Sequence, residues 1–391
     1  LGPRVFISVT GVRFSYGLPR KLRFFSGLSY FIFIKFKDMF KKSRYLSWRY
    51  VYSLIKFSKS IPDYIKISNS SYLGVDGKDL PLKIIKGKNS LGRTLIIYPG
   101  ASPTAEQHPA MNFLGSVLAN IGFDVFIPRI PPLKELNISD VNVLHFQKAY
   151  EELIKRDDIK NNSISCMGVS YGGALLLKSS LSESMLQTPP HTIITYGTIY
   201  DIETSLDFIL TGKLTIKGKE VKIKPHEWGV VVGFHNFLSS IDIGYDTTHI
   251  QKVLKLRIQD KHDQVDEELK KIKEPYRQLL VDVLDSRIST EVKRIIDIIL
   301  KDQIHILNSI SPRLWCKDVQ QKVFVMHGAN DNMVPYTQSV QLSENIPNAE
   351  LFISYLYEHN EIAPKRSIFF KIKELKRLVD YIRKFIKYHE N

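Results

Sequence analysis

A serine lies between two glycines in the stretch CMGVSYGGA, which covers residues 166–174. Ser170 follows an apolar run and precedes a run with helical spacing, and Gly168 and Gly172 stand two positions before and after it. A serine hydroxyl is a poor nucleophile at its free pKa, so it needs a nearby base and must protrude from the fold. A sharp turn from strand to helix makes it protrude, and small residues at those two positions avoid clashes across the turn. The stretch therefore predicts a nucleophilic serine.

The surroundings of this serine fit that prediction. Residues 163–167 read as a strand and residues 171–181 as a helix, within a pattern typical of a parallel sheet. In this context the sequence GVSYGG, residues 168–173, resembles the α/β-hydrolase family. The resemblance covers residues 82–387 in outline and implies a mostly parallel sheet flanked by helices, with serine hydrolase chemistry. The alternative is an ordinary tight turn with an inert serine.

The family's chain order is serine, then an acid, then a histidine, which makes Asp331 the expected acid. It follows an apolar strand in the stretch VFVMHGANDNMVP, residues 323–335. In that role it would hold the histidine in one tautomer and stabilise the imidazolium. Asp331 could instead be only a turn residue, because Asn-Asp-Asn is turn chemistry. Asp201 is a rival, since some family members carry the acid one strand earlier.

The resemblance places the histidine after the last strand, where His359 follows the predicted strand 350–354, 28 positions after Asp331. It would take the serine's proton and return it to the leaving group. Most family members have Gly before this histidine, whereas this chain has Glu358. The alternative is a histidine in a surface loop. His327 ends a strand, and we expect it to be structural.

Two backbone N–H groups are expected to hold the oxyanion of the tetrahedral intermediate. The first belongs to Tyr171, directly after the serine. The second usually follows the first central strand, where this chain reads Tyr-Pro-Gly-Ala-Ser. Gly100 allows a close backbone approach there, so Ala101 is the expected second donor and Ser102 the rival.

The rest of the chain indicates an α/β protein. Short apolar strands alternate with longer helices up to residue 200, and the alternation resumes after residue 310, which is typical of a parallel sheet with right-handed crossovers. Residues 201–310 are mostly helical in pattern and stand where the family often inserts a cap. We therefore expect a core of residues 66–200 and 311–391, a helical cap over 201–310, and a basic, helical N-terminal extension over 1–65.

The net charge of +15 is concentrated in that extension. Residues 1–60 contain 13 Lys or Arg and one acidic residue, so they carry +12 and leave +3 for the other 331 residues. The globular part is thus nearly neutral, and nucleic-acid binding is not expected. The longest uncharged run, residues 24–34, is shorter than the roughly 20 residues of a spanning helix.

Aromatic and basic residues interleave through residue 57. This pattern predicts contact with an anionic membrane surface, with packing on the catalytic domain, a poorly ordered extension or a secretory signal as alternatives. We expect a cytoplasmic protein that associates peripherally with a membrane. Because the sequence begins with Leu1, the natural start is left open, with Met39 as one candidate.

Together these features predict a serine hydrolase that cleaves a carboxylic ester, thioester or amide through an acyl-enzyme on Ser170. The alternatives are an acyltransferase with the same triad and a non-catalytic binding protein of the same fold. The expected partner is a small-molecule acyl substrate. No cofactor or metal is expected, because the sequence contains no HExxH, paired CxxC, P-loop or GxGxxG motif. Two cysteines, Cys166 and Cys316, do not make a disulfide scaffold.

Overall fold

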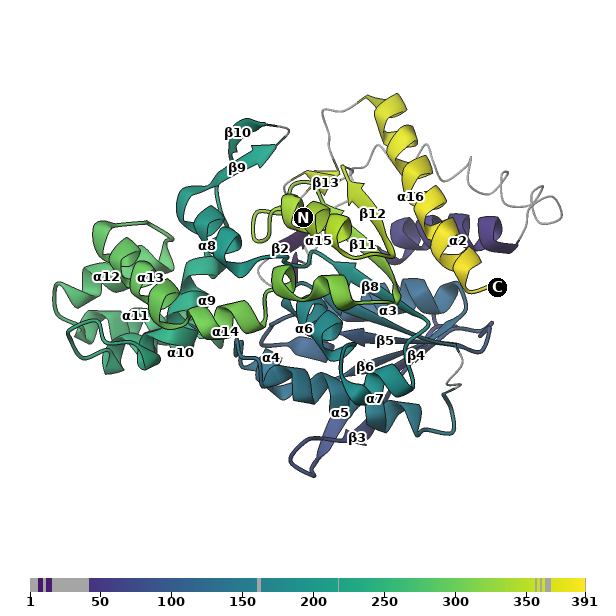
Figure 1. The fold of residues 1–391 in the computed structure, drawn as a ribbon, viewed down its shortest axis with the longest axis horizontal. Coiled ribbons are helices and arrows are strands. Elements are labelled where there is room, and N and C mark those ends of the chain that lie inside the picture. Colours follow the sequence, from purple (N-terminus) through teal and green to yellow (C-terminus); the bar gives the residue numbers. More distant parts are fainter. Residues whose placement is uncertain are drawn as a thin grey trace.

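A computed structural model gives the fold of most of the chain (Figure 1). The residues that it describes are 6–9, 12–15, 42–159, 163–216, 218–355, 357–358, 361–362 and 367–390.

The centre of the molecule is an eight-stranded sheet in the order β12-β11-β8-β7-β5-β6-β4-β3. β4 runs antiparallel to both of its neighbours, and all other pairs are parallel. The mostly parallel sheet predicted from the sequence is confirmed. The strands are β3 (Lys66–Leu73), β4 (Asp79–Lys86), β5 (Arg93–Tyr98), β6 (Phe123–Pro128), β7 (Ile164–Val169), β8 (Thr192–Tyr196), β11 (Lys322–Gly328) and β12 (Ala349–Ser354).

The central strands are apolar because both of their faces are covered. Side chains of β5 alternate between two cores: Ile96 and Tyr98 point into one, Leu95 and Ile97 into the other, and all four are fully buried. Edge strand β3 carries mostly exposed polar residues, in the sequence KISNSSYL. A polar edge does not recruit a further strand easily.

Helices cover the two faces. One face holds α2 (Lys42–Phe57), α3 (Pro109–Asn120) and α16 (Ile368–Tyr388). The other holds α5 (Asn142–Ile154), α6 (Tyr171–Ser179) and α15 (Tyr336–Asn345). The chain therefore leaves β5 toward one face, into α3, and leaves the adjacent β7 toward the other, into α6. A crevice opens at such a switch point beyond the carboxyl ends of the strands, and ligands commonly bind there.

The chain between β8 and β11 forms a mainly helical block beyond that end of the sheet (Figure 1). The expectation of a mostly helical stretch holds, with two differences. An unpredicted hairpin joins β9 (Lys213–Ile216) to β10 (Lys219–Lys222). Residues 290–306, whose sequence pattern by itself predicts one helix, form two helices divided near Gln303. The helices are α8 (Ile202–Thr211), α9 (Trp228–Phe237), α10 (Thr248–Ile258), α11 (His262–Lys271), α12 (Tyr276–Leu284), α13 (Thr290–Asp302) and α14 (Ile304–Ser309). The apolar core of this block is continuous with the core beneath α6.

The described part of the predicted N-terminal extension contains a hairpin and a helix. The hairpin pairs β1 (Phe6–Val9) with β2 (Val12–Ser15). Helix α2 buries Leu46, Tyr50 and Phe57 in the core that it shares with α3 and α16. Among the described residues, no helix is long and apolar enough to cross a membrane. The uncharged run at residues 24–34 lies outside the described residues.

Shorter elements complete the chain. They are η2 (Ala105–Gln107), α4 (Pro131–Lys134), α7 (Glu183–Gln187), η4 (Leu238–Ser240), η5 (Pro312–Leu314), η6 (Cys316–Asp318) and the antiparallel pair β13 (Tyr357–Glu358) and β14 (Glu361–Ile362).

Candidate active site

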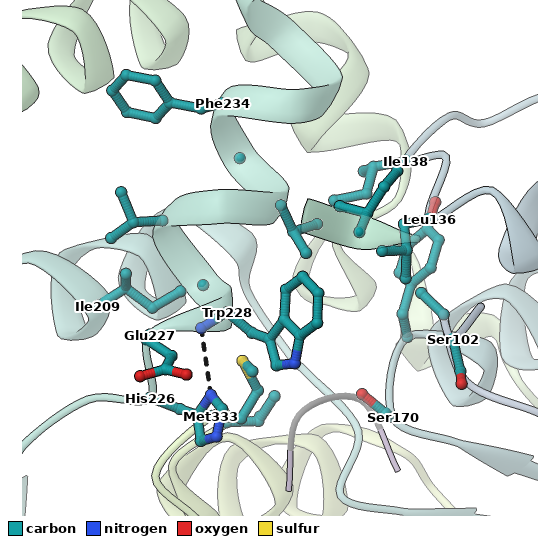
Figure 2. A pocket seen from close by; sticks show the side chains of 18 of the residues that line it. Ser102, Leu136, Ile138, Ser170, Ile209, His226, Glu227, Trp228, Phe234 and Met333 are labelled. Atoms are coloured by element: carbon teal, nitrogen blue, oxygen red, sulfur yellow. Dashed lines mark hydrogen bonds between the residues drawn. The ribbon is translucent and has the colours of Figure 1, made fainter. Parts of the chain in front are cut away.

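Ser170 lies at the turn between β7 and α6, with φ 53° and ψ −128°. A positive φ is unusual for a residue with a Cβ and costs free energy, so the surrounding contacts must enforce it. Those contacts are present: the Ser170 N–H donates to the Tyr196 carbonyl at 2.7 Å, and its own carbonyl accepts from the Gly173 N–H and the Thr198 hydroxyl. No described residue hydrogen-bonds the Ser170 hydroxyl, which faces a cavity (Figure 2).

Three glycines make this turn sterically feasible. A Cβ at Gly168 would lie 2.5 Å from the Gly173 Cα, and one at Gly173 would lie 1.9 Å from the Thr198 hydroxyl oxygen. A Cβ at Gly172 would lie 2.3 Å from the carbonyl oxygen of Pro99, in the loop after β5. Such separations are shorter than any real contact, so the glycines are required by backbone packing. The turn expected from the sequence is therefore present, and it touches the neighbouring loop directly.

Asp331 lies three residues beyond β11. Like Ser170, it is at the edge of the sheet that the carboxyl ends of the parallel strands form. Its Oδ1 accepts the N–H groups of Met333 and Val334 at 2.8 and 3.0 Å, which is the turn arrangement weighed above. Its Oδ2 reaches over the end of β8, where it would lie 3.6 Å from a Cβ at Gly197. Apart from a 3.5 Å approach to His327, no described residue engages Oδ2. The two roles are thus compatible, because one oxygen fixes the loop and the other can still accept a hydrogen bond.

Asp201, the rival acid, is engaged elsewhere. Its Oδ2 caps helix α8 by accepting the Thr204 N–H, and its Oδ1 accepts from the Arg313 guanidinium at 3.1 Å. The side chain is buried. Both oxygens therefore stabilise the start of the helical block, which disfavours Asp201 as the acid of a triad.

His327 is fully buried, with both ring nitrogens occupied. Its Nε2–H donates to the Val334 carbonyl at 2.9 Å, and Nδ1 lies 2.7 Å from the Ser339 hydroxyl. The ring fastens β11 to the Asp331 loop and to α15, which is the structural role expected of it.

His359, the expected base, lies outside the described residues. β12 ends at Ser354 on the edge that also carries Ser170 and Asp331. Beyond it, Tyr357 and Glu358 pair with residues 361–362.

The two expected oxyanion donors flank Ser170. Tyr171 is the first residue of α6, and the N–H groups of a helix's first turn have no acceptor within the helix. Its hydroxyl donates to the Ser139 carbonyl at 3.1 Å, which holds the Tyr171 side chain in place at the start of α6. Ala101 lies in the loop that contacts Gly172. The N–H of the rival, Ser102, already donates to the Leu133 carbonyl at 2.9 Å, which leaves Ala101 as the better placed of the two.

A cavity of about 530 Å³ lies over Ser170, within the range of small-molecule sites. The sheet edge forms its floor, and apolar residues of α8, α9, α13 and α14 form most of its roof. Figure 2 shows Trp228 above and to the left of Ser170, with Met333 to the left of the indole and Leu136 and Ile138 to the right. A largely apolar cavity above a serine hydroxyl suits an acyl chain.

Unusual backbone conformations concentrate around this cavity. Five described non-glycine residues have positive φ, and three of them line the cavity: Leu136, Ser170 and Asp260. Strain of this kind persists only where packing enforces it and is common at functional sites.

His108 also lines the cavity, although no sequence motif singled it out. It caps α3, where its Nδ1 accepts the Ala110 N–H at 3.1 Å, so the neutral ring carries its proton on Nε2. Burial lowers the pKa of His108 to about 4. A neutral ring whose Nε2 is already protonated cannot accept a proton from Ser170 through that atom, so His108 is a hydrogen-bond donor here and not the general base.

Within the described ranges, no three His, Cys, Asp or Glu side chains gather as metal ligands would. Cys166 and Cys316 are free and buried, and burial raises the pKa of both thiols.

No protein-family model and no curated protein matches this chain. Solved structures do show similarity. An acylaminoacyl peptidase in complex with Z-Gly-Gly-Phe-chloromethyl ketone is 13% identical, with a TM-score of 0.47 over 84% of this chain and 42% of that one. The 2,6-dihydroxy-pseudo-oxynicotine hydrolase is 14% identical, with a TM-score of 0.46 over 81% of this chain and 68% of the other. Est1E from Butyrivibrio proteoclasticus is 13% identical, with a TM-score of 0.41 over 82% and 99% of the two chains.

This chain spans less than half the length of the acylaminoacyl peptidase. Similarity at this level identifies neither an activity nor a substrate. The fold class rests on the strand order and on the turn at Ser170.

Proposed function

We propose that the protein is a serine hydrolase that cleaves a carboxylic ester, thioester or amide through an acyl-enzyme on Ser170. The strained, glycine-supported turn that presents the Ser170 hydroxyl to an apolar cavity is the observation that carries this proposal. An inert serine gives no reason to maintain such a backbone conformation.

In the proposed reaction, the Ser170 oxygen attacks the carbonyl carbon while His359 takes the hydroxyl proton. The N–H groups of Tyr171 and Ala101 stabilise the negative charge on the carbonyl oxygen. The leaving group departs with the proton from His359, which leaves the acyl group on Ser170. Water then attacks the acyl-enzyme, gives one proton to His359, and the acid is released with the serine restored. Asp331 orients the imidazole through its free Oδ2.

Chain length is compatible with this role for His359. β12 and β7 are three strand spacings apart, or about 14 Å. His359 is five positions beyond Ser354, and five residue steps can span up to about 17 Å. The side chain adds further reach toward Ser170.

A fluorophosphonate probe tests the proposal, because it reacts covalently with activated serines. We expect labelling of the full chain and its loss in Ser170→Ala, with Ser343→Ala on the outer helix α15 as the matched control. Absence of labelling in a folded wild-type protein would favour the non-catalytic binding protein. If the probe labels Ser170 and the unlabelled enzyme transfers the acyl group of an ester to an added alcohol but does not hydrolyse the ester, the acyltransferase is favoured.

We also propose that the basic N-terminal segment contacts anionic membrane surfaces. Because α2 is packed into the core, the informative comparison is the full chain against one that begins at Lys42. Flotation with phosphatidylserine vesicles should recover the full chain and not the shorter one. Equal recovery of the two would rule the segment out as the contact.

A further inference from the structure

An arginine lies in the otherwise mainly apolar roof of the cavity. Arg257 comes from the last turn of α10, and its side chain is only 14% exposed. Its guanidinium carbon lies 5.0 Å from the ring centre of Trp228, so the cation covers the indole that stands above Ser170. A positive charge is thus held inside the chamber that we assign to the acyl group.

The hydrogen bonds of this guanidinium are largely unmade. A guanidinium has five N–H donors. Arg257 uses one, from Nη2 to Oε1 of Glu227, at a long 3.4 Å. Nothing else in the described part of the chain accepts from it. The Glu227 side chain is 44% exposed, so this ion pair is weak. No nitrogen of Arg257 is among the buried polar atoms that lack a partner in the described residues, so its remaining donors reach solvent. A ligand acceptor would take the place of water at these donors, in a charge-assisted hydrogen bond.

From this geometry we infer that Arg257 binds an anionic group at the far end of the acyl chain. This inference rests on the proposed function. The preferred substrates would be esters whose acyl group is an apolar chain ending in a carboxylate, with the ester carbonyl at Ser170 and the carboxylate at Arg257. In Figure 2, Trp228 lies between Ser170 and Glu227, the partner of Arg257, so the apolar part of the chain would run along the indole. A carboxylate can accept two parallel N–H bonds from the guanidinium.

Two acidic residues, Glu227 and Asp260, lie near Arg257, and each is a potential competitor of such a substrate for the guanidinium. Oδ1 of Asp260 is 2.8 Å from Nε2 of His262, so that oxygen already has a partner, and no ion pair joins Asp260 to Arg257 among the described residues. Glu227 holds one N–H and competes for the rest. Removing the Glu227 charge should therefore strengthen the recognition of a carboxylate, whereas removing the Arg257 charge should abolish it.

The experiment compares two ester series with the same leaving group on the full chain. One series comprises p-nitrophenyl hexanoate, octanoate and decanoate, and the other the mono-p-nitrophenyl esters of adipic, suberic and sebacic acid. At the best-matched length, kcat/KM should be at least about tenfold higher for the carboxylate-ended ester, the effect of one charge-assisted hydrogen bond.

Substitutions assign that preference to Arg257. In Arg257→Gln the ratio should fall about 10- to 100-fold, with the neutral esters little affected. Arg257→Lys should retain part of this preference, because an ammonium keeps the positive charge but lacks the two parallel N–H donors of a guanidinium. Glu227→Gln should raise the ratio. Arg287→Gln is the matched control, since Arg287 belongs to the same block but pairs with Asp282 and Asp285 and does not line the cavity.

Equal rates for the two series in the wild type, unchanged in Arg257→Gln, would overturn the inference and leave the hydrolase proposal standing. Failure of both series together with absent fluorophosphonate labelling would instead defeat the hydrolase proposal. Calorimetry of Ser170→Ala with monomethyl suberate and with methyl octanoate separates the two questions, because it reports binding without turnover and only the first ligand carries a charge. Tighter binding of monomethyl suberate, lost in the Ser170→Ala/Arg257→Gln double variant, supports the anion site, and binding that survives that change contradicts it.

Discussion

The sheet edge around Ser170 and the helical block above it differ in how much room they leave for a larger side chain. At the edge, single atoms decide the structure: a methyl group on Gly172 would meet the Pro99 carbonyl at 2.3 Å. In the block, Gly233 also lines the cavity, yet a Cβ there would have no neighbour within 4 Å. Gly172 at the edge therefore tolerates no larger side chain, whereas the cavity roof at Gly233 can take one without a clash. We expect chemistry to depend on the first region and substrate choice on the second.

The two acids after neighbouring strands give the largest expected contrast. Asp331→Asn should lower kcat by roughly 10⁴-fold with a small change in stability, as loss of the orienting carboxylate does in other triads. Asp201→Ala should leave kcat nearly unchanged and lower the free energy of unfolding by about 1–2 kcal/mol, because it removes a helix cap and a half-exposed ion pair. Ester hydrolysis and urea unfolding of both variants measure this. A larger loss of kcat in Asp201→Ala would reverse our assignment of the acid.

Alanine substitutions at Gly172 and Gly233 provide a second test of the difference between the sheet edge and the helical block. Gly172→Ala should cost about 3 kcal/mol of stability, since a backbone carbonyl cannot move aside as a side chain can. It should also abolish labelling by a fluorophosphonate. Gly233→Ala lies within helix α9 and should gain about 0.5–1 kcal/mol. Urea denaturation of the pair measures both, and equal effects would contradict the distinction between edge and block.

The pH dependence of stability should report on His108. Burial lowers its pKa from 6.5 to about 4 in the folded protein, so between these values the unfolded chain binds more protons. The His108 contribution to stability is therefore complete above pH 6.5 and is lost as the pH falls toward 4. Discounted for solvent screening at the cavity, it amounts to about 2 kcal/mol.

His108→Asn should keep the helix cap and remove this slope, which urea midpoints measured from pH 4 to 7 will show. His389, whose pKa burial lowers to about 3, contributes in the same direction in both proteins and so serves as the internal reference. An identical slope in the variant would mean that His108 is not neutral in the folded state.

The smallest effect concerns chain length. Gly233→Leu fills open space in the cavity roof, so it should shift the preferred acyl chain to a shorter length, with a change of a few-fold in kcat/KM. A nitrophenyl ester series from acetate to decanoate measures the shift. No shift in a folded variant would show that the acyl chain does not reach this part of the roof.

These contrasts also explain what the sequence could predict. The turn at Ser170 was predictable because the spacing of its small residues is a local sequence signal. The loops that Gly172 and Gly173 meet, at Pro99 and Thr198, are not part of that signal. The mostly parallel sheet followed from apolar runs that must be buried on both faces. The antiparallel pairing of β4 was not anticipated, because pairing direction depends on connections and not on the pattern within a strand. The hairpin β9–β10 carries a strand signal, because Leu214 and Ile216, then Val221 and Ile223, alternate with polar residues on either side of Gly218. It was missed because the two strands have four residues each and lie within a mostly helical pattern.

The residues that line the cavity were harder still to predict from the sequence. His108 had one local signal, its position before Pro109 at a helix start, which predicts a cap but not a cavity. Arg257 had none, since it meets Trp228 only through the packing of α10 on α9. Asp201 and Asp331 both accept from N–H groups a few residues further along the chain. What separates them is the contact of Asp201 with Arg313, which is more than 100 residues away and leaves no mark in the local sequence.

The stacking of Arg257 on Trp228 has a practical consequence. The chain contains three tryptophans, of which Trp48 is exposed on the outside of α2 and Trp315 is buried beside Lys178. Only Trp228 both lines the cavity and lies under a movable cation. Its emission should therefore respond when a bound molecule displaces that cation, which gives the protein an intrinsic optical reporter of occupancy that needs no turnover.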